Sequence, residues 1–565
     1  MDLASAPWKA SYPPGLSPAV ELEGWPVHQV VDEAAVQWGG REAVIFRDAV
    51  LTFADLKAEM DRAARAFRAA GVGRGTRIAF LLPNTVYHLV SFFGALKAGA
   101  TVVHLSPLDS ERVLEHKLAD SGARIVVTTN IGELAIRAAG LKARGLIDRL
   151  IVGEDQAFGP SALTGPMPEG NDFSTFAVFV ESSPEQAESV SDPVESKSEV
   201  DIEDLALLQY TGGTTGMPKG AMLTHRNIST AVESYDLWSD FTGTMRRGQE
   251  RVLLVLPLFH IYALTAVMLR CVRGGQTMVM HTRFDPEVAL DEIEAGLTIF
   301  PGVPTMWIAI CSVPGFEKRD YSSLHFCGSG GAPLPVETAR KLKTATGHDL
   351  LGGWGMTETS PAGTNIPTTR PDKVGTIGIP LPGIWVDVVA LDDPARVLPQ
   401  GETGELRIFG PNVTKGYLNR PEETAAAFSE GGLLTGDIGF MDEEGFFTIV
   451  DRKKDMILSG GYNVYPQLIE QMIYEHPDVE EVLVIGIADA YRGEAAKAFV
   501  KLRKGAAPLT LEALCAFLKG RLGRHEMPAA LEIRDALPRT PVGKLSKLEL
   551  KQEEAARRES ARAAS

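Results

Sequence analysis

The chain has 565 residues, a formal net charge of −17 at pH 7 and a pI near 5.2. It is too long for one hydrophobic core, so two or more domains are expected. The acidic balance argues against a nucleic-acid partner, because affinity for the phosphate backbone depends on clustered Lys and Arg.

Several absences point to a cytoplasmic protein. The first residues, MDLASAPWKASYPPG, show neither the basic region nor the apolar core of a signal peptide. The four cysteines form no C-x-x-C pair, which indicates free thiols and neither a metal site nor a disulfide framework. The apolar run from Val252 to Leu269 is interrupted by Pro257, His260 and Tyr262. We therefore interpret it as a strand, a turn and a core helix, and expect no transmembrane segment.

Strand-like and helix-like segments alternate along the first two thirds of the chain. RIAFLL, from Arg77, has the continuous apolar character of a strand buried on both faces, apolar residues at helical spacing follow it, and TVVHL begins at Thr101. This rhythm continues with RIVVTT, RLIVG, TMVMH, LTIF and LHFCGSGG, with helix-like PEVALDEIEAG and PVETARKLKTATG between them. The pattern predicts an α/β fold with largely parallel sheets.

Two segments divide the chain. Residues 181–200 are acidic and rich in Ser and Pro, which predicts a solvated loop. Beyond about Asp451 a smaller unit follows, with the strands EEVLVIGI and AAKAFVKLR and the amphipathic helix LTLEALCAFLKGRL. We expect a large N-terminal domain, residues 1–451, and a small mobile α+β domain, residues 452–565.

The stretch YTGGTTGMPKG, from Tyr210, is typical of a phosphate-binding loop. Its glycines allow backbone N–H groups to approach an anion, its threonines add hydroxyl donors, and Lys219 supplies a positive charge. Proline directly before Lys219 breaks the spacing of the G-x-x-x-x-G-K-[ST] loop. The segment therefore predicts a polyphosphate site of another kind, with a Gly-rich surface turn as the alternative.

Five motifs in order resemble those of the adenylate-forming superfamily, which includes acyl-CoA synthetases, peptide-synthetase adenylation domains and luciferases. They are YTGGTTGMPKGAMLTHRN, GWGMTETSP, LLTGDIGF, VDRKKDMILSGGYNVYP and PRTPVGKLSK. The resemblance covers almost the whole chain. It implies a reaction in which a carboxylate attacks the α-phosphorus of ATP and pyrophosphate departs, so that the loop holds the departing phosphates.

The resemblance assigns an ATP and AMP site. It places Trp354 beside the adenine, Thr357 on phosphate, and Asp437 with Arg452 on the ribose. The full set of implied nucleotide-binding residues is Thr211, Gly212, Gly213, Thr214, Thr215, Lys219, Gly330, Gly331, Ala332, Gly353, Trp354, Gly355, Met356, Asp437 and Arg452.

The resemblance also implies catalytic residues and a magnesium ion. Glu358 is assigned to Mg²⁺, since a carboxylate beside a polyphosphate needs a hard cation between them. Lys544 resembles the catalytic lysine that reaches from the small domain to the carboxylate and the α-phosphate, where an ammonium neutralises developing charge. Thr357 completes this catalytic set.

For the second half-reaction the resemblance implies a swing of the small domain about Lys454. Gly460, Gly461 and Tyr462 would then border the pantetheine channel, and Arg492 would meet a CoA phosphate. One departure puts the CoA-phosphate contact in doubt: relatives often carry a lysine where HEMP places Glu526, and only the neighbouring Arg524 offers compensation.

The acyl pocket is expected near His260, Tyr262 and Val303, with packing as the alternative role for His260. Its glycine-rich walls favour a medium- to long-chain fatty acid, with aromatic and dicarboxylic acids as alternatives. The predicted function is an ATP-dependent carboxylic acid:CoA ligase that uses ATP, Mg²⁺ and coenzyme A. Transfer to a separate carrier protein is the rival, while the segment after Lys544 is too short for a fused carrier domain. A lysine acetyltransferase or deacetylase acting on Lys544, and a homodimer, are further expectations.

Overall fold

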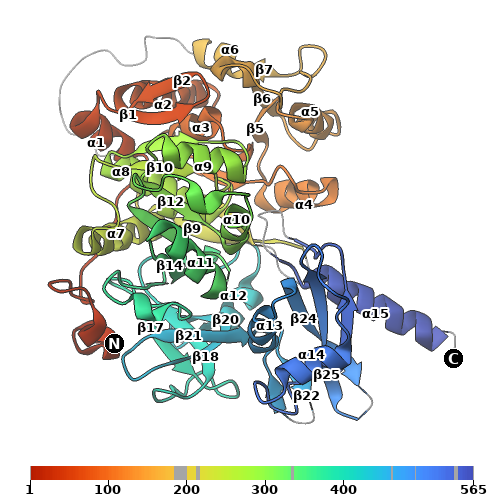
Figure 1. Ribbon diagram of the computed structural model, residues 1–565. Coiled ribbons are helices and arrows are strands. Elements are labelled where there is room, and N and C mark those ends of the chain that lie inside the picture. Colours follow the sequence, from red (N-terminus) through yellow and green to blue (C-terminus); the bar gives the residue numbers. More distant parts are fainter. Residues whose placement is uncertain are drawn as a thin grey trace.

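The computed structural model describes residues 2–182, 200–211, 217–332, 336–459, 462–489, 491–539 and 545–563. Most of the loop predicted at residues 181–200 lies outside these ranges. The predicted α/β class is confirmed, because two large, mostly parallel sheets with helices form the N-terminal part and a smaller β-rich unit follows (Figure 1).

The first sheet has seven strands in the order β7-β6-β5-β3-β4-β8-β9, all neighbours being parallel except β8 and β9. The strands are β3 (Arg77–Leu81), β4 (Thr101–His104), β5 (Ile125–Thr129), β6 (Arg149–Gly153), β7 (Ser174–Thr175), β8 (Leu205–Thr211) and β9 (Lys219–Thr224). Its helices are α4 (Glu111–Ser121), α5 (Leu134–Ala143) and α6 (Phe176–Glu181). The predicted strands from Arg77 and Thr101 begin at those residues.

The second sheet has nine strands in the order β16-β15-β14-β13-β12-β10-β11-β1-β2, parallel from β14 to β1 with antiparallel edges. Its strands are β1 (Glu42–Phe46), β2 (Ala49–Thr52), β10 (Arg251–Leu254), β11 (Thr277–Met280), β12 (Ile299–Gly302), β13 (Phe326–Ser329), β14 (Leu350–Trp354), β15 (Thr364–Asn365) and β16 (Ile379–Pro380). Around it lie α1 (Gln29–Trp38), α7 (His225–Thr242), α8 (Arg270–Gly274), α9 (Pro286–Glu294), α10 (Pro304–Ile310) and α11 (Val336–Thr346).

The two sheets share one hydrophobic core. Helix α3 (Val86–Lys97) is buried along nearly its whole length and packs against α2 (Phe53–Ala69). A helix that is apolar all round belongs in an interior, and residues from both sheets join α3 in the same cluster of buried side chains. This packing fixes the carboxyl ends of the parallel strands relative to each other.

The apolar run from Val252 to Leu269 forms a strand, a turn and a helical segment, as predicted. The helical part, Tyr262–Leu269, is a π-helix, which is a wider coil than the core helix expected from the sequence. Such segments occur mostly as single turns inside α-helices, often at functional sites. Among the described helices, none is both long and apolar enough to cross a membrane.

The remaining strands form two smaller sheets, which are antiparallel except for one parallel edge pair in the second sheet. One contains β17 (Trp385–Val389), β18 (Gly404–Phe409), β19 (Phe428–Ser429), β20 (Gly432–Met441) and β21 (Phe447–Arg452), with α12 (Pro421–Ala427) beside it. The other, in the C-terminal unit, contains β22 (Ile457–Ser459), β23 (Tyr462–Val464), β24 (Val479–Asp489), β25 (Gly493–Leu502) and β26 (Ala530–Ile533). Helices α13 (Pro466–Tyr474), α14 (Leu511–Leu518) and α15 (Leu548–Ala563) complete the C-terminal unit.

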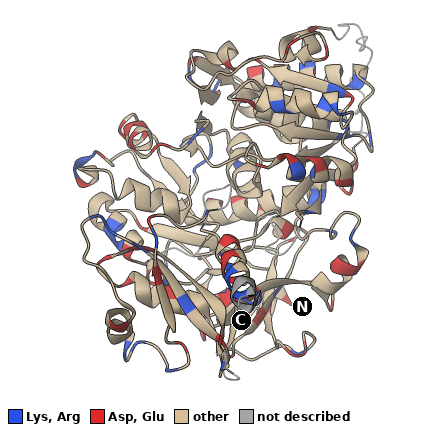
Figure 2. Cartoon of the chain, turned by 90° about the vertical axis from the view of Figure 1, so that its right-hand side faces the viewer, with Lys and Arg blue, Asp and Glu red and all other residues tan. Residues whose placement is uncertain are grey.

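Helix α15 follows directly after the segment that contains Lys544. Figure 2 shows residues of both charges along it. Lys497 Nζ on β25 lies 2.7 Å from Glu554 on this helix, and Arg557 Nη1 lies 2.8 Å from Glu532 on β26. These ion pairs connect α15 to the small sheet.

Candidate active site

A cleft with a volume of about 2090 Å³ lies where the large sheets, the β20–β21 hairpin and the C-terminal unit meet. Most of the described candidate residues line it: Thr211, Lys219, His260, Tyr262, Val303, Gly330, Gly331, Ala332, Gly353, Trp354, Gly355, Met356, Thr357, Glu358, Asp437, Arg452 and Lys454. Residues far apart in the sequence thus converge on one space, as expected where parallel strands end.

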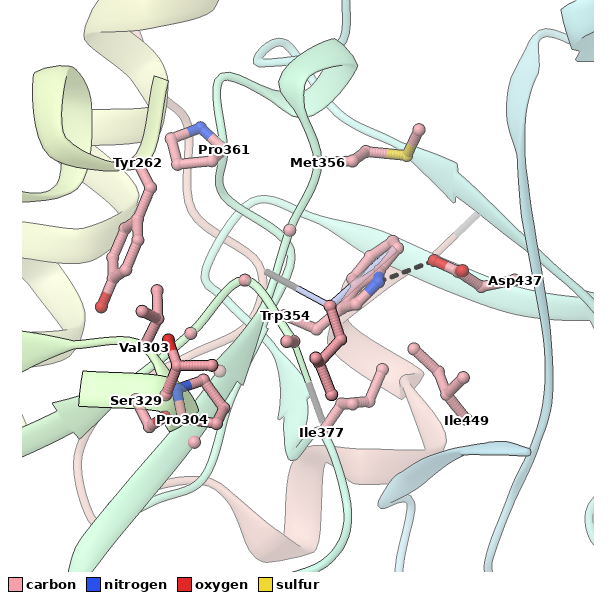
Figure 3. Close-up of a pocket in the computed structure, with 18 of the residues that line it drawn as sticks. Tyr262, Val303, Pro304, Ser329, Trp354, Met356, Pro361, Ile377, Asp437 and Ile449 are labelled. Atoms are coloured by element: carbon pink, nitrogen blue, oxygen red, sulfur yellow. Dashed lines mark hydrogen bonds between the residues drawn. The ribbon is translucent and has the colours of Figure 1, made fainter. Parts of the chain in front are cut away.

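Asp437 is the centre of the polar end of the cleft. Its buried carboxylate accepts a hydrogen bond from Trp354 Nε1 at 2.9 Å and pairs with Arg452 Nε at 2.6 Å (Figure 3). Burial raises the pKa of Asp437, while Arg452 acts in the opposite direction. Asp437 and Arg452 face each other across the β20–β21 ladder, so backbone pairing brings the two side chains together.

Glu358 lies in a short 3₁₀ turn after β14 and is buried. The Tyr417 hydroxyl donates to Glu358 Oε1 at 2.8 Å. Burial raises the pKa of Glu358, and the hydrogen bond from Tyr417 lowers it. Within the described ranges this carboxylate forms no ion pair, and a bound cation would favour its ionised form.

The site fits a magnesium ion held together with a phosphate group. No cluster of three His, Cys, Asp or Glu side chains suited to a metal occurs among the described residues. Mg²⁺ is commonly bound by one or two carboxylates, with substrate phosphates and water completing the octahedron. Glu358 is the carboxylate that would hold it.

Thr211 and Lys219 lie opposite each other beside the segment predicted to bind phosphate. They are paired in the antiparallel β8–β9 ladder. Lys219 forms an ion pair with Glu423 on α12, and its Nζ lies 5.2 Å from the centre of the Tyr417 ring. Gly212, Gly213, Thr214 and Thr215 lie outside the described residues, so their predicted contacts are not tested.

Glycines line the cleft between the residues predicted to bind the nucleotide and those predicted to bind the acyl group. Gly331 has a φ of 79°, in the left-handed region that glycine adopts without strain. A Cβ atom on Gly355 would lie 1.4 Å from the Pro361 carbonyl oxygen, and a Cβ atom on Gly330 would lie 3.1 Å from the Tyr262 ring. Side chains at these positions would displace the neighbouring chain or narrow the pocket.

Tyr262 and Val303, which were predicted for the acyl pocket, lie together with Ser329 in Figure 3 on the side of Trp354 away from Asp437. His260 lines the same space, and its Nδ1 accepts from the backbone N–H of Tyr262 at 3.3 Å. Cys327 is fully buried nearby, and burial raises the pKa of its thiol to about 12. A thiol that stays protonated is a poor nucleophile.

Lys454 lies in the turn between β21 and β22, where the chain enters the C-terminal unit. Its carbonyl accepts from Lys551 Nζ on α15 at 3.3 Å, and Lys551 pairs with Asp455 at 2.6 Å. Desolvation lowers the pKa of Lys454. Lys544 lies outside the described residues, whereas Leu545, Ser546 and Lys547, directly after it, line the cleft.

The described residues predicted to bind CoA lie elsewhere. Tyr462 is 62% exposed, stacks on His525 with ring centres 4.9 Å apart, and is not among the residues lining the cleft. Arg492 is exposed beside Asp489 and does not line the cleft either. The Glu526 carboxylate accepts from the backbone N–H of Gly523 at 2.7 Å. Gly460 and Gly461 lie outside the described residues.

Sequence reasoning missed several residues of the site. Tyr417 occurs in a stretch outside the five motifs, and its contact with Glu358 joins positions 59 residues apart. Ile377 and Ile449 flank Trp354 in Figure 3, and each is an ordinary apolar residue in the sequence. Glu405 supports the β20–β21 hairpin, because its carboxylate accepts from the backbone N–H of Gly436 at 3.0 Å and from Lys453 Nζ at 2.8 Å.

Comparison with known proteins places the chain in a family. Residues 31–418 match the model of the AMP-binding enzymes, and residues 468–544 match that of the AMP-binding enzyme C-terminal domain. A long-chain-fatty-acid–CoA ligase from Bacillus subtilis is 38% identical over 97% of this chain and 98% of its own length. A feruloyl-CoA synthase from an Amycolatopsis species is 36% identical over 94% of this chain and 98% of its own length. The crystal structure of ATP-bound MatB from Rhodopseudomonas palustris superposes with a TM-score of 0.81 at 27% identity, covering 94% of this chain and 99% of that one.

The chain therefore belongs to the AMP-binding enzyme family, which confirms the predicted membership of the adenylate-forming superfamily. The relatives' names agree with the predicted enzyme class within it, an AMP-forming acyl-CoA synthetase that uses ATP, Mg²⁺ and CoA.

Proposed function

We propose that this enzyme is an ATP-dependent fatty acid:CoA ligase that acts through an acyl-adenylate. The observation on which the proposal rests is that one cleft joins a polar end, with Asp437 and Glu358, to an acyl end, with Tyr262 and Val303. A nucleotide and a carboxylic acid can therefore meet in it.

In the first half-reaction the acid carboxylate attacks the α-phosphorus of ATP, and pyrophosphate leaves. Asp437 accepts from the ribose hydroxyls, exchanging part of its bonding to Trp354 and Arg452, and Trp354 borders the adenine. Lys219 and the loop beginning at Thr211 hold the departing phosphates, with Thr357 on phosphate and Glu358 as the ligand for Mg²⁺, which supplies charge neutralisation. Lys544 neutralises charge that develops on the carboxylate and the α-phosphate.

In the second half-reaction the CoA thiolate attacks the acyl carbon, and AMP leaves. This step requires the small domain, residues 452–565, to turn about Lys454, withdrawing Lys544 and bringing Gly460, Gly461 and Tyr462 to the cleft, with Arg492 toward a CoA phosphate. The end of β21 at Arg452 supports a boundary at this point. The exposure of Tyr462 supports a CoA site assembled only after rotation.

The acid is proposed to be a medium- to long-chain fatty acid. The glycine wall and the apolar lining by Val303 and Ala266 leave room for a linear chain, and the Bacillus subtilis relative is named for such a substrate. Aromatic acids are the alternative, since another relative is named feruloyl-CoA synthase and the Tyr262 ring borders the acyl end.

We place the enzyme in the cytoplasm. All four cysteines are free, which agrees with a reducing compartment. Acetylation of Lys544 by a lysine acetyltransferase, reversed by a deacetylase, would remove its charge and stop adenylation. Self-association as a homodimer stays a prediction, to be measured by light scattering.

The test uses purified enzyme, Mg²⁺, ATP and a panel of fatty, aromatic and dicarboxylic acids. We expect acid-dependent exchange of labelled pyrophosphate into ATP, and AMP release that requires CoA. If none of the acids in the panel supports pyrophosphate exchange, the proposal is contradicted. Release of AMP with a carrier protein but not with CoA favours the carrier-loading alternative.

A further inference from the structure

The acyl end of the cleft contains a charged residue that the adenylation chemistry does not use. The π-helical segment and the residue after it line the cavity at Tyr262, Ala266 and Arg270. Residues spaced four apart lie along one side of a helix, so these three follow the wall in order. Eight residues would span about 12 Å at the α-helical rise of about 1.5 Å per residue. The wider π-helical coil rises less per residue, so Arg270 lies within about 12 Å of Tyr262 along the helix axis.

Tyr262 marks the near end of this wall, because its ring lies against Gly330 in the turn next to the nucleotide end. Arg270 therefore marks its far end. There the cavity is lined by the rings of Tyr235 and Trp238, and by Met245, Ser239 and Thr244. The pocket that begins with apolar residues thus ends beside a guanidinium group and two hydroxyl groups.

The Arg270 side chain is only 11% exposed, and its hydrogen-bonding capacity is incompletely used. Nε lies 3.3 Å from Asp236 Oδ1, Nη1 donates to the Ala266 carbonyl at 3.4 Å, and Nη2 donates to Ser239 Oγ. A guanidinium group has five N–H donors, so two have no acceptor within the described part of the chain. Buried donors without acceptors are costly, and a bound oxygen atom would satisfy them.

The charge of Arg270 is only partly compensated. Asp236, which is buried, also pairs with Arg273 Nη1 at 3.0 Å, so one carboxylate serves two guanidinium groups. The neighbouring Asp240 is paired with Arg247 at 2.9 Å. The Tyr235 ring centre lies 5.2 Å from Arg270 Cζ and adds a cation–π contact but no negative charge.

We propose that Arg270 forms the far end of the acyl pocket and selects acids whose distal end carries an oxygen acceptor, a hydroxyl or a carboxylate. This inference rests on the proposed ligase function and narrows its substrate class to distally oxidised fatty acids. The free N–H groups of Arg270, with Ser239, bind the distal oxygen. A terminal methyl group at the same place would leave those donors unsatisfied.

The chain offers a matched control. Arg273 pairs with the same Asp236 and stacks on Trp25, but it is not among the described residues that line the cavity. Removing its charge perturbs the same ion-pair group without changing the pocket wall. Arg270→Met and Arg273→Met therefore separate recognition in the pocket from electrostatic support of the fold.

The experiment measures kcat/KM for decanoic, 10-hydroxydecanoic and decanedioic acids, whose extended chains match the distance from Tyr262 to Arg270, by ATP–pyrophosphate exchange, and competes the acids in pairs on the unmodified enzyme. We expect the unmodified enzyme to prefer an oxidised acid by about tenfold or more. Arg270→Met should abolish that preference, and Arg273→Met should keep it. The hydroxy and dicarboxylic arms show which oxygen group is preferred.

Three results would overturn the inference: a preference for decanoic acid in the unmodified enzyme, an unchanged ratio in Arg270→Met, or equal changes in both variants. If Arg270→Met does not fold, the competition assay on the unmodified enzyme still tests whether oxidised acids are preferred. If decanoic acid supports exchange and no oxidised acid is preferred, only the inference about Arg270 is refuted, whereas the absence of exchange with every acid refutes the ligase function itself.

Discussion

Replacing Tyr417 with Phe removes one hydrogen bond from the proposed magnesium ligand and leaves the aromatic ring in place. The hydroxyl donates to Glu358 Oε1 at 2.8 Å in a buried setting, and the ring keeps its position under Lys219. A hydrogen bond to a charged group contributes about 1.5–3 kcal/mol. If this bond orients Glu358 for catalysis, adenylation should slow by roughly ten- to 150-fold.

The same change has a predictable pH signature. Burial raises the pKa of Glu358, and the bond from Tyr417 lowers it, so the Phe variant should have a still higher Glu358 pKa. Since the ionised carboxylate is the form that holds Mg²⁺, the acid limb of the rate profile should move to higher pH.

The assay is pyrophosphate exchange measured against Mg²⁺ concentration and pH. Tyr12→Phe serves as the control, because it removes a buried hydroxyl that donates to the Pro380 carbonyl and does not line the cleft. Wild-type Mg²⁺ dependence together with an unshifted acid limb in Tyr417→Phe would refute the assigned role of this contact.

Three further outcomes are expected. Lys544→Ala should abolish adenylate formation but spare thioester formation from preformed acyl-AMP. Lys454→Pro should spare adenylate formation and block thioester formation. Equal losses in both half-reactions would contradict the proposed rotation. Asp437→Asn should raise the KM for ATP at least tenfold, because a neutral amide is a weaker acceptor for the ribose hydroxyls. Comparing the KM for ATP with the KM for deoxy-ATP in both enzymes tests this. Burial lowers the pKa of His28 to about 4 and that of His225 to about 3, below their unfolded value near 6.5. The free energy of unfolding is therefore unaffected by these histidines above about pH 6.5 and falls as the pH drops toward 4, by about 3 kcal/mol for His28 alone. Thermal unfolding measured between these pH values tests this.

Local sequence patterns predicted the elements that build the large sheets. The continuous apolar runs from Arg77 and Thr101 became β3 and β4, because a strand covered on both faces needs no alternation. The run before Leu269 became a π-helix where a regular core helix was expected, since a continuous apolar sequence does not distinguish a wide coil from a narrow one.

The motif resemblance located the polar end of the cleft, because its members occur in short contiguous stretches such as GWGMTE. Sequence patterns did not predict the residues that join the site through a single long-range contact. Tyr417 reaches Glu358 from a segment with no distinctive pattern, and Arg270 joins the pocket only because α7 and the π-helix pack side by side. The residues proposed to bind CoA would reach the cleft only through the proposed rotation of the small domain, which no local sequence pattern encodes.

The pairing of Asp437 with Arg452 has a consequence for timing. Arg452 is the last residue of its strand, and Lys454 follows two positions later. In the proposed mechanism, the rung that binds the ribose therefore lies two residues from the residue about which the small domain turns. Because loss of AMP would change the contacts of Arg452 directly beside that turn, we expect AMP release and the return of the small domain to occur in the same kinetic step.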